Sequence, residues 1–253
     1  VTAGQLVFTP AANANGAGYA RFTFSVRDSV NAYDPTPNTL TINVTAVNDA
    51  PTDLSLSAST VAENAANGTV VGTITATDPD AGDTKAYTFT DSAGGRFAIN
   101  RTTGVITVAN GTLLNYEAAT SHSVTVRVTD SGGLTYDETF TINVTNVNED
   151  PTDIALDNDS VAENQPIGTV VGNLSSTDPD VGDSFTYSLV SGAGSTDNAL
   201  FTIVGGELRT AAIFDFESVS SYSIRIRTTD AGGLFSEKVF TINVKDSNDA
   251  PVL

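Results

Sequence analysis

Hydrophobic and polar residues alternate along most of this chain with a period of two, the spacing of side chains on a β-strand. In one such run, Val124, Val126 and Val128 alternate with Thr125 and Arg127. Runs of this kind are short and are bounded by Gly, Pro, Asn and Asp, and no stretch has the spacing of an amphipathic helix. The pattern therefore predicts a protein built from short β-strands.

The sequence also repeats itself at an interval of 100 residues. Val-Ala-Glu-Asn begins at Val61 and again at Val161, and Gly-Thr-Val-Val-Gly begins at Gly68 and Gly168. Loops inside the two copies differ in length, yet the acidic positions keep their interval, as expected if those positions form one kind of site. We predict three parts, namely the C-terminal part of a preceding repeat at 1–50 and full repeats at 51–150 and 151–253.

Each full repeat holds enough alternating runs for a two-sheet structure. The first full repeat is predicted to form seven strands, at about 54–58, 69–77, 86–90, 97–100, 105–109, 122–130 and 135–146. Seven short strands in 100 residues indicate an all-β fold of tandem seven-stranded antiparallel β-sandwiches with immunoglobulin-like Greek-key connections, joined end to end.

Charge narrows the function. The chain has 253 residues with 30 Asp and Glu against 11 Lys and Arg, a formal net charge of −19. Such acidity argues against nucleic acid and anionic membrane surfaces as partners, because both are bound through clustered Lys and Arg. No cysteine is present, so small secreted domains of this kind must be stabilised by something other than a disulfide, such as a bound metal. Because the chain begins at Val1, we expect it to be part of a longer protein.

Acidic residues gather in two kinds of stretch, a connector at 146–151 and an Asp-Pro-Asp-x-Gly-Asp run that starts at Asp178. Two carboxylates about 5 Å apart repel by roughly 3 kcal/mol at an effective dielectric constant near 20. A cation is therefore expected among them, and ligands that offer only oxygen suit Ca²⁺. Turn formation alone is the alternative reading of the run, but its recurrence at Asp78 favours the metal.

Five motifs occur in the same order in both repeats: Ala-Glu-Asn, Asp-Pro-Asp, an aromatic-Glu pair, Thr-Asp-x-Gly-Gly and a connector of the form Val-Asn-Asp-x-Pro or close to it. In this order the repeats resemble bacterial cadherin-type domains, the tandem modules of large secreted adhesins. The resemblance covers both full repeats and the fragment before them. It implies that Ca²⁺ lies between consecutive sandwiches.

The resemblance also implies which residues hold the metal. For the junction of the two full repeats these are Glu63, Asn115, Glu117, Asn148, Glu149, Asp178, Asp180 and Asp230, the carbonyls of Val147 and Asp150, and Asp183 as a ligand or a neighbour of the ligands. For the preceding junction they are Asn48, Asp49, Asp78, Asp80 and Asp130, with Asp83 in the same loop as Asp80. For the following junction they are Glu163, Asp215, Glu217, Asn248 and Asp249. Asn115 and Glu149 depart from the family's usual Asp.

These features together predict a calcium-rigidified extender of an extracellular, multi-domain bacterial surface protein, with neighbouring repeats of the same chain as its partners. The alternatives are a module that binds surface or matrix glycans or like domains, and accessory domains of a secreted enzyme. Catalysis by this stretch is not expected, since each acidic cluster recurs in every repeat. His122, the single histidine, is expected at the edge of a sandwich rather than in a catalytic site.

Overall fold

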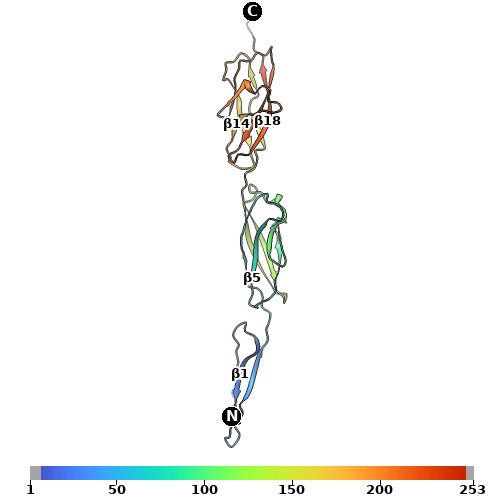
Figure 1. Cartoon of the computed structure of the whole chain (residues 1–253), viewed down its shortest axis with the longest axis vertical. Coiled ribbons are helices and arrows are strands. Elements are labelled where there is room, and N and C mark those ends of the chain that lie inside the picture. The colour runs from blue at the N-terminus through green and yellow to red at the C-terminus, as the bar shows by residue number, and fades with distance from the viewer. Residues whose placement is uncertain (1–6, 249–253) are drawn as a thin grey trace, which may run out of the picture. The chain divides into compact units, whose positions relative to one another are not determined.

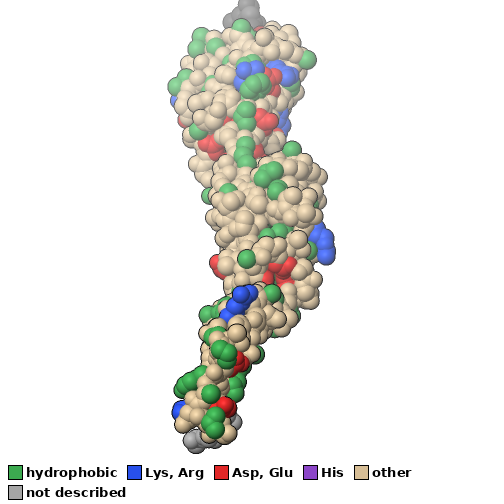
Figure 2. Space-filling model, turned by 60° about the horizontal axis from the view of Figure 1, so that its bottom comes forward, with side chains coloured by type: hydrophobic (Ala, Val, Ile, Leu, Met, Phe, Trp, Pro, Cys, Tyr) green, Lys and Arg blue, Asp and Glu red, His purple; other side chains and the backbone are tan. Residues whose placement is uncertain are grey.

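The computed structural model describes residues 7–248, and these divide after Thr145 into two compact units. Both units are built from β-strands, as Figure 1 shows. The face seen in Figure 2 is mostly uncharged, with few Lys and Arg side chains. The described residues contain no helix with the length and apolar character of a membrane span.

The first unit opens with an antiparallel hairpin of β1 (Gly16–Phe24) and β2 (Asn38–Val44). A β-sandwich follows. Its strands are β3 (Asp53–Leu56), β4 (Thr60–Ala62), β5 (Val70–Thr77), β6 (Ala86–Asp91), β7 (Phe97–Ile99), β8 (Val105–Val108), β9 (Ser121–Thr129) and β10 (Thr135–Thr145). A short 3₁₀ helix, η1 (Gly111–Leu113), lies between β8 and β9.

The two sheets of this sandwich have the orders β3-β5-β8-β7 and β4-β10-β9-β6. Strands β3 and β4 are adjacent in sequence but belong to opposite sheets, so the chain crosses between the sheets at its start. All pairings are antiparallel except that of β4 with β10, which joins Val61 to Val144 in parallel. The second and last strands of the sandwich are thereby paired directly.

The second unit repeats this arrangement. Its strands are β11 (Asp153–Leu156), β12 (Ser160–Ala162), β13 (Val170–Thr177), β14 (Thr186–Leu189), β15 (Phe201–Val204), β16 (Glu207–Thr210), β17 (Ser221–Thr229) and β18 (Phe235–Lys245), with the 3₁₀ helix η2 (Asn198–Leu200) before β15. Its sheets have the orders β11-β13-β16-β15 and β12-β18-β17-β14, with β12 parallel to β18. The internal repeat in the sequence is therefore a repeat of the fold.

Alternation along the strands places the core as the sequence predicts. Val124, Val126 and Val128 on β9 are fully buried, and so are Ile224 and Ile226 on β17. The residues between them point to the outer face of the sheet. Each buried aliphatic side chain contributes about 1.5–3 kcal/mol through burial, so these central strands hold each sandwich together.

The predicted fold class is confirmed, since the chain is all-β and forms two tandem sandwiches. The seven predicted strands of the first full repeat are all present, with ends shifted by a few residues. The eighth strand, β4, was missed because three residues are too few to show an alternating pattern. The predicted fragment at 1–50 contains the β1–β2 hairpin. The exact domain boundaries stay a prediction.

Candidate metal centres

Carboxylates converge inside each unit in groups whose oxygen atoms lie within 4.8 Å of one another. In the second unit one group contains Asp178, Asp183 and Asp230, and another contains Glu163, Asp215 and Glu217. In the first unit the counterpart of the former contains Asp78, Asp83 and Asp130.

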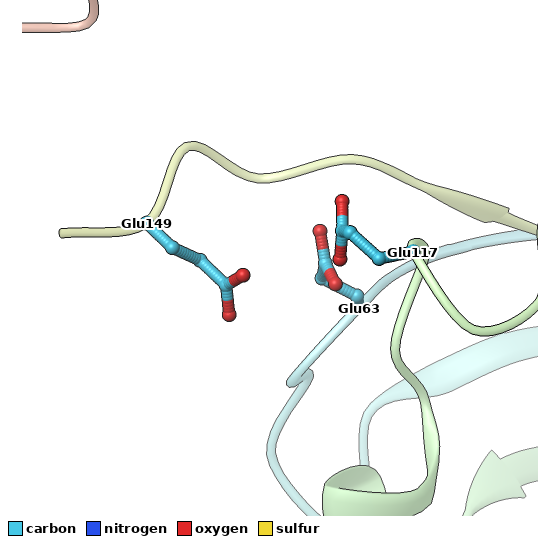
Figure 3. Close-up of side chains that lie close together, drawn as sticks. All are labelled: Glu63, Glu117 and Glu149. Atoms are coloured by element: carbon cyan, nitrogen blue, oxygen red, sulfur yellow. The ribbon is translucent and has the colours of Figure 1, made fainter. Parts of the chain in front are cut away.

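The first unit also brings together Glu63 and Glu117, the counterparts of Glu163 and Glu217. Figure 3 draws these two side chains with Glu149, which lies on the connector four residues beyond the end of β10. Glu63 follows β4 directly, and Glu117 lies in the turn that precedes β9. Residues 54 positions apart in the sequence thus share one end of the sandwich.

The Asp-Pro-Asp-x-Gly-Asp run folds into a tight turn after β13. The N–H of Asp180 donates to Oδ1 of Asp178 at 2.9 Å, and the N–H of Asp183 donates to the carbonyl of Asp180 at 3.3 Å. Gly182 has φ +93°, a left-handed conformation that favours glycine. The first unit repeats both hydrogen bonds at the same lengths. The run therefore does form a turn, and this turn places its carboxylates side by side.

Asp230 reaches this turn from the loop after β17. Its Oδ1 accepts a hydrogen bond from the N–H of Leu234 at 2.8 Å, and its Oδ2 accepts one from Nδ2 of Asn148 at 2.8 Å. Asp130 is held in the same way by the N–H of Leu134 and by Asn48. Both aspartates are 6% exposed. The Thr-Asp-x-Gly-Gly turn and the connector asparagine thus fix this carboxylate from two sides.

The connector also binds the middle aspartate of the turn. Oδ2 of Asp180 accepts the N–H of Glu149 at 2.8 Å, and its Oδ1 accepts Nδ2 of Asn146 at 2.7 Å. In the first unit, Oδ2 of Asp80 accepts the N–H of Asp49 at 2.7 Å. These bonds hold the backbone of each connector against the acidic turn of the sandwich that follows it in the same unit.

Glu163 is 1% exposed although it is a carboxylate. Its Oε2 accepts the N–H of Phe216 at 2.8 Å, and its Oε1 accepts the N–H of Ser247 at 2.7 Å. These two backbone donors, that of Phe216 first, hold the pKa of Glu163 below its usual value. The side chain is therefore ionised at neutral pH, as a metal ligand must be.

Three buried oxygen atoms in the aspartate clusters lack a hydrogen-bond partner within the described part of the chain, namely Oδ2 of Asp78, Asp178 and Asp183. Burial raises the pKa of Asp178, and the charges of Asp180, Asp183 and Asp230 raise it further. A buried carboxylate oxygen without a partner is costly. A cation would remove that cost.

The two units differ in the charge of one side chain beside this cluster. Lys85 places its Nζ 4.0 Å from Oδ2 of Asp78, whereas the second unit has Phe185 at the corresponding position. The Asp178 cluster therefore lacks that nearby cationic side chain. The ligand atoms predicted for this cluster are all oxygen, from carboxylates, carbonyls and amides, which is the set that Ca²⁺ prefers.

The structure places the predicted site residues differently. Those in the convergent groups or hydrogen-bonded directly to them are Glu63, Glu117, Glu163, Asp215, Glu217, Asp78, Asp80, Asp83, Asp130, Asp178, Asp180, Asp183, Asp230, Asn48, Asn148, Asp49 and Glu149. Asn115 instead accepts the N–H of Ala118 at 2.6 Å within its own turn. Val147 is exposed, as are Asp150 and Asn248, and Asp249 lies outside the described residues.

Asn146 was missed by the sequence analysis although it binds Asp180. Its counterparts in the other two connectors are Ala46 and Asp246, so the repeat gives no signal at this position. Lys85 was missed for the same reason, since its counterpart is Phe185.

The fold and these clusters define a class of protein: tandem β-sandwich modules with acidic groups at both ends of a module. The cadherin domain model matches residues 57–145 and 158–245. This chain belongs to the cadherin family.

Curated relatives agree with this assignment. The chain is 37% identical over 202 residues to the protocadherin-like wing polarity protein stan of Drosophila melanogaster, which covers 75% of this chain and 6% of the relative. It is 32% identical over 217 residues to protocadherin Fat 4 of Homo sapiens, which covers 81% of this chain and 4% of the relative. The chain thus spans only a small part of these proteins.

Solved structures support the fold. The solved structure of extracellular cadherin domains 1–5 of protocadherin gamma B2 matches this chain with a TM-score of 0.67 and 19% identity. The match covers 90% of this chain and 46% of the solved one. The ectodomain of human desmocollin-1 matches 90% of this chain and 48% of that chain, with a TM-score of 0.55 and 22% identity. The curated relatives and desmocollin-1 are animal proteins, so the expected bacterial adhesin origin finds no support among them.

Proposed function

We propose that this chain is a calcium-rigidified extracellular segment of a longer adhesion protein, in which Ca²⁺ joins each repeat to the connector and to the next repeat. The observation that supports it most is the Asp178, Asp183 and Asp230 group, in which the buried Oδ2 atoms of Asp178 and Asp183 lack a hydrogen-bond partner among the described residues. Positive charge that enters such a group would offset the repulsion between its carboxylates and the cost of their burial.

The proposed ligands come from three parts of the chain. Glu63 and Glu117 at the end of the first sandwich would share ions with Glu149 of the connector. Asp178, Asp180 and Asp230 would supply the other side, with Asn148, the carbonyls of Val147 and Asp150, and Asp183 around them. Ca²⁺ takes six to eight oxygens, so no single loop supplies enough of them.

One departure from the family pattern, Asn115, affects one edge of this proposed site. Asn115 is neutral, and its side-chain oxygen accepts the N–H of Ala118. Its counterpart Asp215 belongs to the carboxylate group with Glu163 and Glu217. The ion nearest Asn115 is therefore proposed to be held more weakly than the ion at the corresponding position near Asp215.

Calcium binding would therefore change both the stability of the fold and the stiffness of the connector. Extracellular calcium modules bind with dissociation constants of about 10⁻⁴–10⁻³ M, concentrations met outside cells. An ion that binds only the folded state stabilises it by about 2.7 kcal/mol when calcium is at 100 times the dissociation constant. The connector would be flexible without calcium and stiff with it.

A calcium titration tests this proposal. Thermal unfolding and small-angle X-ray scattering are measured with EGTA, with millimolar Ca²⁺ and with millimolar Mg²⁺. We expect Ca²⁺ to raise the melting temperature and to narrow the distribution of interatomic distances, with Mg²⁺ much less effective. Asp178→Asn should weaken both responses, whereas Asp137→Asn, at an exposed pair with Arg127, should leave them intact. Identical melting and scattering with and without Ca²⁺ would contradict the proposal.

A second candidate function is recognition of a like domain or of surface glycans. Membership in the cadherin family favours a like domain over glycans as the partner. Repeats of this family are typically non-catalytic adhesion modules. Sedimentation velocity with calcium separates self-association from a purely extending role, and a glycan array tests the other branch. A bacterial origin stays a prediction.

A further inference from the structure

One hairpin differs between the two sandwiches in a way that uncovers a pocket. Phe97 and Gly104 bracket the β7–β8 turn and lie seven positions apart, whereas their counterparts Phe201 and Gly206 lie five positions apart. The end of the turn is anchored alike in both, since the N–H of Ile74 donates to the carbonyl of Gly104 at 2.9 Å and Leu174 donates to Gly206 at 2.8 Å. The two missing residues therefore come from the tip.

In the first sandwich, the tip of this hairpin reaches across to the opposite sheet. The N–H of Tyr87 on β6 donates to the carbonyl of Arg101 at 2.8 Å. Tyr87 is only 8% exposed. The hairpin thus covers the tyrosine ring and occupies the backbone donor of an edge strand.

In the second sandwich the described residues provide no counterpart of that hydrogen bond. Tyr187 is half-buried rather than buried, and an open pocket of about 410 Å³ lies beside it. The pocket is lined by Leu174, Phe185, Thr186, Tyr187, Ile203, Gly205 and Gly206. This volume is within the range of small-ligand sites.

The pocket is uncharged, and its lining combines apolar side chains with polar atoms of Thr186, Tyr187 and the glycine turn. No lining side chain is charged, and Phe185 stands where the first sandwich has Lys85. The hydroxyl of Tyr187 is already engaged, because it accepts a hydrogen bond from Oγ of Ser176 at 3.2 Å. Among the described strands, β14 is an edge strand that pairs with β17 in the same register as β6 with β9. We therefore infer that the N–H of Tyr187 points away from β17, as that of Tyr87 does toward Arg101.

We propose that this pocket binds an extended peptide segment of another protein chain. The segment would place a backbone carbonyl on the N–H of Tyr187 and one aliphatic side chain against Leu174 and Ile203. The first sandwich shows the required chemistry, since its own hairpin supplies the carbonyl of Arg101 at that position. Addition of a strand to an open sheet edge is a recurrent mode of peptide recognition.

The test uses the full chain labelled with ¹⁵N and with ¹³C in its methyl groups. The probe is N-acetyl-leucine N-methylamide, which carries one aliphatic side chain and backbone carbonyls. We expect saturable chemical-shift changes at the Tyr187 amide and at the methyl groups of Leu174 and Ile203, with a dissociation constant on the order of 1 mM, as usual for so small a ligand.

The matched control restores the longer hairpin by replacing residues 204–205 with the Asn-Arg-Thr-Thr segment of residues 100–103. This variant fills the pocket from within, and it should keep the amide shifts of the rest of the sandwich while losing the response to the probe. No saturable shift in the natural chain, or the same shifts in the variant, would overturn the proposal. Neither result depends on calcium, so the outcome is separate from that of the proposed function.

Discussion

The carboxylate of Glu163 accepts a hydrogen bond from the backbone N–H of Phe216, 53 residues away, at 2.8 Å. Glu63 and Tyr116 make the same bond at the same distance in the first sandwich. Both glutamates are almost fully buried. In each sandwich, the glutamate that follows the short second strand is thus tied to the loop that carries the aromatic-Glu motif. The two glutamates, Glu63 with Glu117 and Glu163 with Glu217, come together as a consequence.

The first prediction concerns Glu63→Gln. The amide oxygen can still accept from Tyr116, so the calcium-free melting temperature should change little, whereas the loss of charge should weaken calcium binding by tenfold or more. Isothermal titration calorimetry measures the affinity. Glu207→Gln serves as the control because Glu207 pairs with Arg209, outside the carboxylate groups. Equal calcium affinity in Glu63→Gln and the natural chain would show that Glu63 is no ligand.

The second prediction is that Asp178→Asn shifts the melting temperature in opposite directions without and with calcium. Without calcium, Asp178→Asn removes a charge that burial and its acidic neighbours disfavour, so the melting temperature should rise by about 2–4 °C. With calcium the same variant loses a ligand and should melt below the natural chain. Differential scanning calorimetry in EGTA and in Ca²⁺ measures both. A variant less stable under both conditions would point to a packing role instead.

The third prediction follows from the raised pKa of Asp178. A carboxyl whose folded-state pKa lies above its unfolded value near 3.8 destabilises the folded state at high pH, and this penalty fades as pH falls through the folded pKa. In EGTA, the advantage of Asp178→Asn should therefore shrink between pH 7 and pH 4. Urea midpoints at several pH values measure it. A constant difference would mean that Asp178 does not titrate as argued.

The fourth prediction concerns His122, whose Nε2 is buried without a hydrogen-bond partner among the described residues. Burial, and then the charge of Arg96, lower its pKa. Stability from the neutral imidazole is present above the unfolded pKa near 6.5 and is lost as pH falls through the folded pKa.

Replacement by the residue found in the other repeat isolates this effect. Tyr222, the counterpart of His122, packs on the ring of Phe214 with centroids 4.6 Å apart. His122→Tyr should therefore remove the loss of stability of the first sandwich between pH 7 and pH 5, seen as a urea midpoint that no longer falls. Tyr222→His should introduce the same loss into the second sandwich.

The fifth prediction tests the core. Ile224 is fully buried, so Ile224→Ala should reduce the free energy of unfolding by about 2–5 kcal/mol. Val239 lies on the outer face of the same sheet and is 43% exposed, so Val239→Ala should change it by less than about 0.5 kcal/mol. Urea unfolding measures both. Similar losses in the two variants would contradict the assignment of inner and outer faces.

How far the sequence predicts this molecule depends on the length and repetition of each signal. Alternation over nine residues located β9 and β17, and the interval of 100 paired every acidic turn with its copy. Strand β4 has only three residues and no pattern of its own; its position follows from parallel pairing with β10, a long-range contact.

The residues of the candidate site also divide into those that recur in both repeats and those that occur in only one. Asp178, Asp183 and Asp230 were predictable because all three recur, and the structure brings them within 4.8 Å. Asn146 and Lys85 occur in only one copy, so their contacts with Asp180 and Asp78 could not be read from the repeat. The pocket beside Tyr187 results from a two-residue deletion, whose consequence depends on which strand the longer hairpin reaches.

The most direct measurement of the central claim is a crystal structure of the chain grown in millimolar Ca²⁺, with anomalous difference density collected to locate the ions. We predict ions at 2.3–2.6 Å from oxygens of Asp178, Asp180 and Asp230, and others shared by Glu63, Glu117 and Glu149. Well-ordered carboxylates with no anomalous density among them would contradict the account.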